Sequence, residues 1–173
     1  MKAELLKRLR EIRILESGRF VLQNAGKSAF YVDVKKAYGY PDILNGISDA
    51  LWAGIDKSTT CIASSGHGGI SPASVISAKY GLNLTLIRDG FKNHGRRDII
   101  DGYIPGQEDK VSIVDDVFTT GGGLLHMIGV LTPLDCRILG CHVVVKRSRR
   151  EFSSPLHYLF SLEDLAGNGP DGI

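Results

Sequence analysis

The sequence contains few cysteines and no long uninterrupted apolar segment. Its three cysteines, Cys61, Cys136 and Cys141, are odd in number, lie among apolar residues and show no CxxC spacing. Neither a disulfide framework nor a zinc site is therefore indicated. Nowhere do about 18 apolar residues follow one another, as a membrane-spanning helix requires, and the charged N-terminus has no signal-peptide core. We expect core cysteines, no membrane partner and a cytoplasmic protein.

An excess of charge of one sign is also missing. Lys and Arg number 21 against 19 Asp and Glu, which gives a formal net charge of +2. A domain held to nucleic acid mainly by phosphate contacts carries a clear basic excess, so no nucleic-acid partner is expected. Local basic clusters such as residues 146–150 would still attract small anions. With 43% apolar residues, the 173 residues suffice for a single domain, residues 1–173, with a full core.

Hydrophobic periodicity predicts an α/β order of elements. Apolar residues at helical spacing predict a helix over residues 2–16, and aromatic and Val-rich segments around a glycine turn predict strands at 19–23 and 29–34. Short apolar strands then alternate with helices, which predicts a mainly parallel central sheet flanked by helices. The expected strands are residues 60–64, 82–88, 111–114, 137–145 and 156–160. One helix is expected to begin at Pro41, and two more are expected over residues 71–80 and 122–131.

One connection is long for a compact fold. Residues 89–109 carry several glycines, and their cations gather in the first half of the segment. Structureless loops of this length are uncommon inside a domain, and functional lids are one usual reason for them. In a parallel α/β sheet, ligands collect outside the carboxyl ends of the strands, where this connection begins. We therefore expect residues 89–109 to close over a site.

Residues 111–123 read VSIVDDVFTTGGG, an apolar strand followed by two acids and a glycine-rich turn. The glycines let successive N–H groups point at one spot at a helix start, which suits a phosphate monoester. Adjacent carboxylates can accept hydrogen bonds from a sugar's vicinal hydroxyls or hold waters around Mg²⁺. A ribose 5-phosphate would satisfy both halves, although the acids alone could end a strand and the glycines alone could cap a turn. The GxGxxG and GxxxxGK[ST] fingerprints are absent, which disfavours the usual dinucleotide and NTP sites.

This segment resembles the 5-phosphoribosyl-1-diphosphate (PRPP) motif of type I phosphoribosyltransferases. Residues 20–35, 88–95 and 161–165 resemble the N-terminal run, the mobile loop and the C-terminal end of the orotate branch of that family. The resemblance implies the type I phosphoribosyltransferase fold, with residues 1–36 contributing to a small N-terminal hood. It implies transfer of the phosphoribosyl group from PRPP to orotate in pyrimidine biosynthesis, with Mg²⁺ as cofactor. It also implies a homodimer in which the mobile loop, residues 89–109, completes the neighbouring site.

The resemblance assigns roles to individual residues. The catalytic set would be Lys92, His94, Asp115 and Asp116, with the two acids on the ribose hydroxyls. PRPP would further be bound by Arg88, by the diphosphate loop Ser65, Gly66, His67 and Gly68, and by Val117, Phe118, Thr119, Thr120, Gly121, Gly122 and Gly123 near the 5-phosphate. Orotate would be bound by Lys27, Phe30, Tyr31, Thr119 and Arg147. No protein group would bind Mg²⁺ directly, since PRPP and water would hold it beside the two acids.

Two departures from the family pattern leave alternatives open. Asp89 stands where the family usually has a lysine, and Lys146 stands where it usually has an aspartate. The first bears on the catalytic rate and the second on base specificity. A type I phosphoribosyltransferase for another nucleobase and a PRPP-binding regulator without turnover therefore remain alternatives. Residues 65–69 could also be an ordinary strand-to-helix turn. Phe30 and Tyr31 could be part of the core of the hairpin, and the basic residues could be solvated surface charges.

Overall fold

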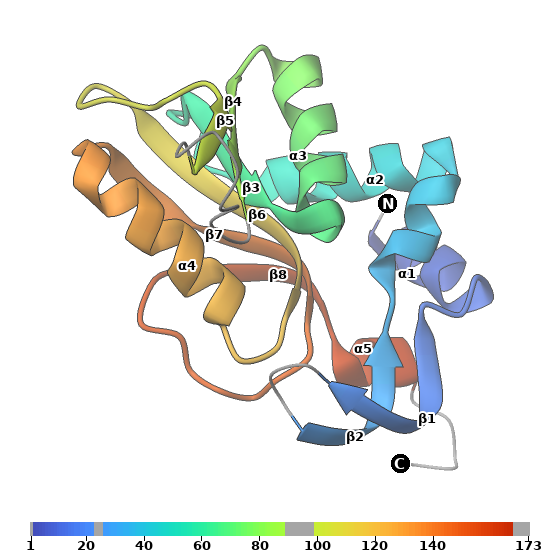
Figure 1. The fold of residues 1–173 in the computed structure, drawn as a ribbon. Helices are drawn as coiled ribbons and strands as arrows, with labels where there is room; N and C mark the ends of the chain where they lie inside the picture. Colours follow the sequence, from blue (N-terminus) through green and yellow to red (C-terminus); the bar gives the residue numbers. More distant parts are fainter. Residues whose placement is uncertain (1, 23–25, 89–98, 168–173) are drawn as a thin grey trace.

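The computed structural model describes residues 2–22, 26–88 and 99–167, and for residues 19–22 and 26–29 it describes the backbone alone. Its centre is a six-stranded sheet in the order β5-β4-β3-β6-β7-β8 (Figure 1). Every neighbouring pair is parallel except β4 and β5, which are antiparallel. The strands are Cys61–Ser65 (β3), Asn83–Ile87 (β4), Ile100–Gly102 (β5), Lys110–Phe118 (β6), Arg137–Lys146 (β7) and Leu156–Ser161 (β8). The predicted α/β class with a mainly parallel sheet is confirmed.

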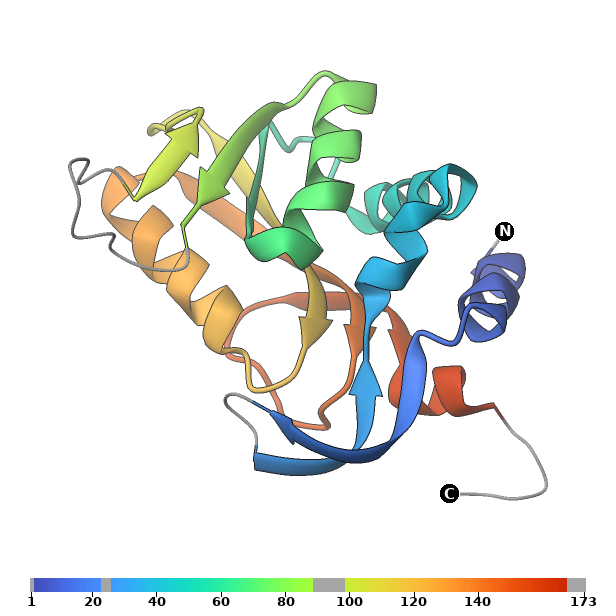
Figure 2. The same cartoon turned by 45° about the vertical axis from the view of Figure 1, so that its right-hand side comes forward.

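Helices cover both faces of this sheet. Helices α2 (Pro41–Gly54) and α3 (Gly66–Tyr80) lie on one face and α4 (Gly122–Leu131) lies on the other (Figures 1 and 2). Because successive side chains of a strand point to opposite faces, Ile62 of β3 enters the core that contains α2, whereas Cys61 and Ala63 enter the core that contains α4. The shorter helices are η1 (Val34–Gly39), η2 (Thr132–Leu134) and α5 (Leu162–Ala166).

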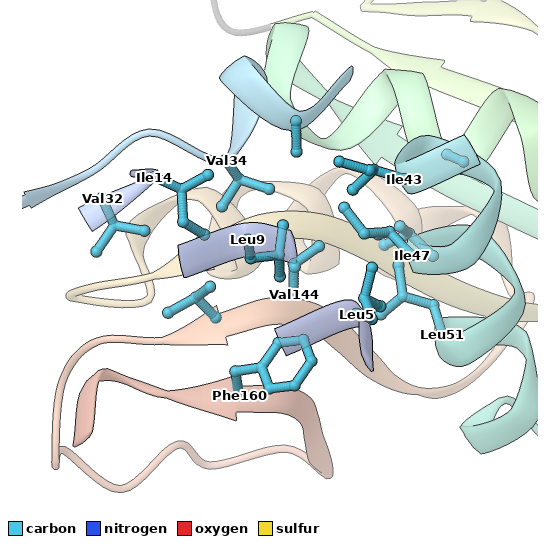
Figure 3. Close-up of a cluster of buried hydrophobic side chains, with 14 of the residues drawn as sticks. Leu5, Leu9, Ile14, Val32, Val34, Ile43, Ile47, Leu51, Val144 and Phe160 are labelled. Carbon is cyan, nitrogen blue, oxygen red and sulfur yellow. The ribbon is translucent and has the colours of Figure 1, made fainter. Parts of the chain in front are cut away.

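The larger core ties the N-terminal helix α1 (Lys2–Glu11) to the rest of the molecule. Leu5 and Leu9 of α1 are both buried. Figure 3 shows them beside Val144 of β7 and Phe160 of β8, with Ile47 of α2 close by. Burying a side chain of this size contributes about 1.5–3 kcal/mol, so α1 is held in place by its apolar face.

The three cysteines occupy the positions expected from their apolar surroundings. Cys61 and Cys141 are fully buried, Cys136 is partly buried, and all three are free thiols. Burial raises the pKa of Cys61 to about 11 and that of Cys141 to about 12, so both thiols stay protonated and unreactive. Within the described ranges, no helix is both long and apolar enough to cross a bilayer.

The first helix ends at Glu11, not at residue 16 as its periodicity predicts. Arg13 adopts a positive φ of 54°, which breaks the helix, and Leu15 begins strand β1 (Leu15–Leu22). This strand forms an antiparallel hairpin with β2 (Gly26–Val32), in which Leu15 is opposite Val32. The apolar residues at the end of this segment fit both the spacing of a helix and the alternation of a strand. Pairing with β2 selects the strand.

The connection after β4 contains a strand that the sequence did not predict. Edge strand β5 pairs with β4, and the amide of Tyr103 donates to the carbonyl of Leu84 at 2.9 Å. The expectation that residues 89–109 form one structureless loop is therefore wrong for residues 100–102. Three residues are too few to show the alternation that marks a strand. Residues 89–98 lie outside the described part of the chain.

The hairpin of β1 and β2 stands apart from the central sheet. Both views place it beyond the carboxyl ends of β6 and β7, beside the turn that leads into α4 (Figures 1 and 2). It thus occupies the place of the N-terminal hood that the sequence predicts, next to the edge where ligands of such sheets bind.

Candidate functional site

Five parallel strands, β3, β4, β6, β7 and β8, end along one edge of the sheet. Ser65 at the end of β3 is opposite Ile87 at the end of β4, and Phe118 at the end of β6 is opposite Lys146 of β7. The segments that leave this edge after β3, β4, β6 and β7 are the start of α3, Arg88, residues 119–121 and Arg147. All of them belong to the predicted site, so the parallel topology brings together segments that are far apart in the sequence.

The two acids lie inside β6 and not after its end. The sequence predicts a strand that stops at Val114, but β6 continues to Phe118 because it keeps pairing with β7. Its pairing with β3 stops at Val114. Asp115 and Asp116 therefore have a strand neighbour on one side only, and both are half-buried. Two adjacent acids are rare in strands, which is why the sequence pattern placed the end of the strand too early.

Each acid binds the backbone of the next residue. Oδ1 of Asp115 accepts a hydrogen bond from the amide of Asp116 at 2.9 Å, and Oδ1 of Asp116 accepts one from the amide of Val117 at 2.8 Å. A carboxylate that accepts a backbone N–H has its orientation fixed, since its rotation would break that bond. The two carboxylates are therefore held in defined positions at the edge of the sheet.

The first turn of α3 lies against Asp116. A Cβ atom added to Gly68 would lie 2.0 Å from Oδ2 of Asp116, and one added to Gly69 would lie 2.5 Å from Oγ of Ser64. Only glycine permits so close an approach. The helix starts at Gly66 and not at residue 71, so the predicted diphosphate loop of residues 65–68 is the entry into α3, where His67 is exposed.

The turn from β6 into α4 has the strand–turn–helix form that a phosphate cradle needs. Gly121 precedes the helix with a φ of +84°, and a Cβ added there would lie 3.0 Å from the ring of Phe118. A Cβ added to Gly123 would lie 3.4 Å from Oδ2 of Asp115. The amides at the start of α4 thus lie beside the acid pair, at a helix end that favours anions. Thr119 and Thr120 are half-buried in the same turn.

Helix η1 adds Lys35, which the sequence alone suggests is a surface charge, although the family resemblance also allows a lysine near PRPP at this position. Its Nζ pairs with Oδ1 of Asp33 at 2.9 Å. Burial alone would lower the pKa of Lys35, but the hydrogen bond and charge of Asp33, together with the charge of Asp116, raise it above its ordinary value. Lys35 therefore places a cation within electrostatic range of Asp116.

Helix η1 also carries Tyr38, which sequence reasoning missed. Its hydroxyl donates to the carbonyl of Gly68 at 2.8 Å. Burial, followed by the charges of Asp116 and Asp115, raises the pKa of Tyr38 well above its ordinary value, so the hydroxyl stays a neutral donor. No periodic pattern marks a short 3₁₀ helix, and the contact joins residues 30 positions apart, so the sequence carried no signal for it.

Arg88 reaches from the end of β4 to β5. Its Nε and Nη2 donate to the two carboxylate oxygens of Asp101, each at 2.7 Å. Bidentate pairs of this kind fix the plane of the guanidinium. The carbonyl of Arg88 lies 2.9 Å from Nε2 of His126 on α4. Arg88, which is predicted to bind PRPP, is thus held at the edge of the sheet by Asp101, a residue that the sequence did not single out.

The residues predicted to bind the acceptor base are distributed over several places. Phe30 and Tyr31 are successive residues of β2, so their side chains point to opposite faces. Phe30 lines a cavity of about 250 Å³ formed with residues of α1, β1 and α5, whereas Tyr31 lies within electrostatic range of Lys35. The structure does not bring Phe30 and Tyr31 to one surface.

Arg147 is the predicted orotate ligand at the carboxyl edge itself. It follows β7 directly, and its amide donates to the carbonyl of Phe118 at 3.0 Å. Its side chain is half-buried, and burial lowers the pKa of its guanidinium. A half-buried cation next to the end of β6, where the chain turns towards α4, is suited to an anionic ligand. The side chain of Lys27, together with Asp89, Lys92 and His94, lies outside the described residues.

The acid pair fits a magnesium ion that is bound mainly through its ligand. In the part of the chain that the structure describes, no three His, Cys, Asp or Glu side chains are grouped as a metal site. Mg²⁺ usually keeps several waters and binds one or two carboxylates plus substrate phosphates. The half-buried oxygens of Asp115 and Asp116, next to two glycine-lined turns, are donors of that kind.

Several curated relatives of this chain belong to one family. No protein-family model matches the chain. The orotate phosphoribosyltransferase of Methanopyrus kandleri is 31% identical over 172 residues, which cover 96% of this chain and 92% of that protein.

Two solved structures share the fold. The crystal structure of orotate phosphoribosyltransferase from Aeropyrum pernix has a TM-score of 0.79 at 24% identity, covering 91% of this chain and 93% of that chain. The UMP synthase of Leishmania donovani also has a TM-score of 0.79, at 22% identity, and the match covers 95% of this chain but 37% of the synthase chain. At these identities, the two structures show the fold alone.

Proposed function

We propose that this chain, which belongs to the orotate phosphoribosyltransferase family, transfers the 5-phosphoribosyl group of PRPP to orotate. A ring nitrogen of orotate forms the new bond to the anomeric carbon of the ribose and releases its proton to the solvent or to the diphosphate. At the same time the bond to diphosphate breaks, and its electron pair leaves with diphosphate. The products are orotidine 5'-monophosphate and diphosphate. The observation that carries the proposal is the contact of the acid pair of β6 with the first turns of both α3 and α4.

The donor half of the site would hold PRPP at three points. Asp115 and Asp116 accept hydrogen bonds from the ribose hydroxyls, residues 117–123 hold the 5-phosphate at the start of α4, and residues 65–68 hold the diphosphate. Gly68 lies against one acid and Gly123 lies near the other. A single sugar phosphate therefore reaches all three segments, which supports the assignment.

The charges around this site suit the expected transition state. As the bond to diphosphate breaks, the ribose becomes cationic and the leaving group gains negative charge, so fixed charges on each side are the useful catalytic groups. The acid pair lies on the ribose side, and Arg88, with Lys92 and His94, would lie on the diphosphate side. Mg²⁺ bound with PRPP, beside Asp115 and Asp116, would neutralise further phosphate charge.

The acceptor half would be formed by cationic and aromatic residues. Arg147 meets the orotate carboxylate or ring edge, Thr119 adds a hydroxyl, and Lys27, Phe30 and Tyr31 approach from the hairpin. The position of Arg147, directly after β7 and bonded to Phe118, supports its part in this set. Because Phe30 and Tyr31 point to opposite faces of β2, only one of them can stack on the base without a change in the hairpin.

We also propose that the chain is a cytoplasmic homodimer of single-domain subunits, in which residues 89–109 complete the neighbouring site. Equilibrium sedimentation tests the dimer. Mixing two inactive variants, Lys92→Ala and Asp115→Asn, tests the exchange, because one site of a mixed dimer then receives both native residues. Recovered activity on mixing supports exchange, and its absence in a dimer of mixed subunits argues against it.

The proposed activity is tested by following the loss of orotate absorbance with PRPP and Mg²⁺ present. Turnover by the wild type and its loss in Lys92→Ala support the proposal. Equilibrium binding of uracil, hypoxanthine and adenine with PRPP present tests the alternative of another nucleobase. Tight binding of a purine, with no binding of orotate, would overturn the orotate assignment.

A PRPP-binding regulator without turnover is the second candidate. The pairing of Arg88 with Asp101 favours it. Arg88 is predicted to bind the diphosphate, and two of its N–H donors already bind the carboxylate of Asp101. Asp89 adds a second negative charge to the same connection. Binding of PRPP by the wild type without any loss of orotate would select the regulator.

A further inference from the structure

Helix α3 contains a proline where a helical donor is needed. Pro72 is buried inside the helix, four residues after Gly68. A proline has no N–H, so the carbonyl of Gly68 cannot receive the usual helical hydrogen bond, and the proline ring also crowds that carbonyl. The hydroxyl of Tyr38 donates to the same carbonyl at 2.8 Å. A side chain from η1 thus replaces the backbone donor that Pro72 lacks.

The same glycine is in contact with the ribose-binding acid. The Cα of Gly68 faces the carboxylate of Asp116 so closely that an added Cβ would lie 2.2 Å from Cγ. Gly68 is therefore held on one side by Tyr38 and limited on the other by Asp116. Any rotation of this turn would change both the contact with Asp116 and the direction of the amides at the start of α3.

We propose that Tyr38 is a positioning residue for PRPP: by binding the carbonyl that Pro72 leaves without a helical donor, it fixes the first turn of α3 relative to Asp116. This role rests on the proposed function of residues 65–68 as the diphosphate loop. In this role Tyr38 acts through the carbonyl of Gly68 and not by contact with the reacting atoms.

The surroundings of Tyr38 suit this task. Its hydroxyl is partly buried near three carboxylates, those of Asp116, Asp115 and Asp33, all of which favour its neutral form. A buried carbonyl left without a donor is unfavourable. The first turn of α3 is therefore more stable in the position in which Tyr38 can bind the carbonyl of Gly68. Helix η1, which carries Tyr38, contacts both α3 and β6. It therefore packs against the two elements whose relative position Tyr38 is proposed to fix.

The test is a double-mutant cycle on Tyr38 and Pro72. Tyr38→Phe removes the hydroxyl, and Pro72→Ala restores an N–H that can bond to the carbonyl of Gly68. The matched control is Tyr80→Phe at the far end of the same helix, which removes a hydroxyl that donates to Asp49 at 2.7 Å. For each variant, the dissociation constant of PRPP is measured by calorimetry and the free energy of unfolding by urea denaturation. If Pro72→Ala does not fold, Pro72→Ser supplies the same N–H.

We expect Tyr38→Phe to weaken PRPP binding about tenfold, the effect of one unsatisfied buried carbonyl. In the Pro72→Ala background, the same change should weaken binding less than about threefold, because the backbone N–H now serves the carbonyl. Tyr80→Phe should leave PRPP binding unchanged. Unchanged binding in Tyr38→Phe, or an equal loss in both backgrounds, would overturn the positioning role.

Failure of the proposed function can be told apart from failure of this inference. If the wild type binds no PRPP, the diphosphate assignment is wrong, and the positioning role for PRPP is wrong with it. The hydrogen bond is then still tested by the free energies of unfolding. Non-additive effects of Tyr38→Phe and Pro72→Ala support the replacement of the backbone donor, and additive effects contradict it.

Discussion

The carboxylate of Asp116 lies on the Cα of Gly68. A Cβ at position 68 would come within 2.0 Å of Oδ2 and 2.7 Å of Oδ1. This contact joins the acid pair of β6 to the first turn of α3, the helix that follows β3. The spacing between the proposed ribose and diphosphate sites therefore depends on the absence of a side chain at position 68.

The substitution Gly68→Ala is expected to abolish or strongly weaken PRPP binding. A methyl group at this position must displace either the Asp116 carboxylate or the first turn of α3, because contacts below about 3 Å between non-bonded heavy atoms are not tolerated. Calorimetry should show a loss of affinity of about 5- to 150-fold, since overpacking costs about 1–3 kcal/mol.

The matched control is Gly129→Ala in α4, where an added Cβ would meet nothing within 4 Å. Alanine is the better helix former, so this variant should gain about 0.5–1 kcal/mol in its free energy of unfolding and should bind PRPP like the wild type. Native affinity in Gly68→Ala would contradict the close packing of Asp116 on the turn.

The double substitution Asp115→Asn with Asp116→Asn should abolish PRPP binding and leave the protein folded. The amide side chains keep the shape but lose the negative charge, and their NH₂ groups cannot accept hydrogen bonds from ribose hydroxyls. Circular dichroism and calorimetry together provide the measurement. Asp135→Asn, at an exposed residue with a φ of +57° that asparagine tolerates, is the control. Unfolding of the double variant would mean that the acids serve the fold.

Arg147→Gln should raise the KM for orotate without changing the dissociation constant of PRPP. Removing a half-buried cation that binds an anionic base costs about 1.5–3 kcal/mol, which corresponds to more than a tenfold rise. Arg149→Gln is the control, since Arg149 is 92% exposed and pairs with Glu163 at 3.0 Å. An equal effect of both substitutions on orotate would show that Arg147 acts only through the general charge of this segment.

The pH dependence of stability should reflect His142 of β7. Its ring stacks on that of His157, with centroids 4.9 Å apart. Burial, followed by the charges of His157 and Lys57, lowers the pKa of His142 to about 4. In the unfolded chain, a histidine takes up a proton below about pH 6.5, so the unfolded state binds more protons between these two values. The free energy of unfolding should therefore be highest above pH 6.5 and fall as the pH drops towards 4.

Urea denaturation at pH 7 and pH 5 measures this effect. The wild type should lose about 1–2 kcal/mol more than His142→Gln over this interval. In His157→Gln, which removes only a secondary cause of the shift, most of the pH dependence should remain. An identical loss in the wild type and in His142→Gln would show that His142 is not the group responsible.

Short-range patterns were sufficient for the α/β order and for the strand–turn–helix at residues 111–123. The alternation of apolar runs and helices, together with the glycines of the PRPP motif, is readable because neighbouring residues along the chain determine it. The hairpin was predicted for the same reason. The faces of the hairpin on which Phe30 and Tyr31 lie were not predicted, because both residues are apolar enough to pack on either side.

Contacts between distant segments decided the remainder. Asp115 and Asp116 lie inside β6 because β7 extends beyond β3 as its neighbour, and Arg88 is held by an acid on a strand too short to predict. The bond from Tyr38 to Gly68 depends on the meeting of η1 and α3. The sequence by itself determined which residues could bind a ribose phosphate. The tertiary structure alone decided how they are held, because hydrogen-bond partners and close packing are set by which strands and helices become neighbours.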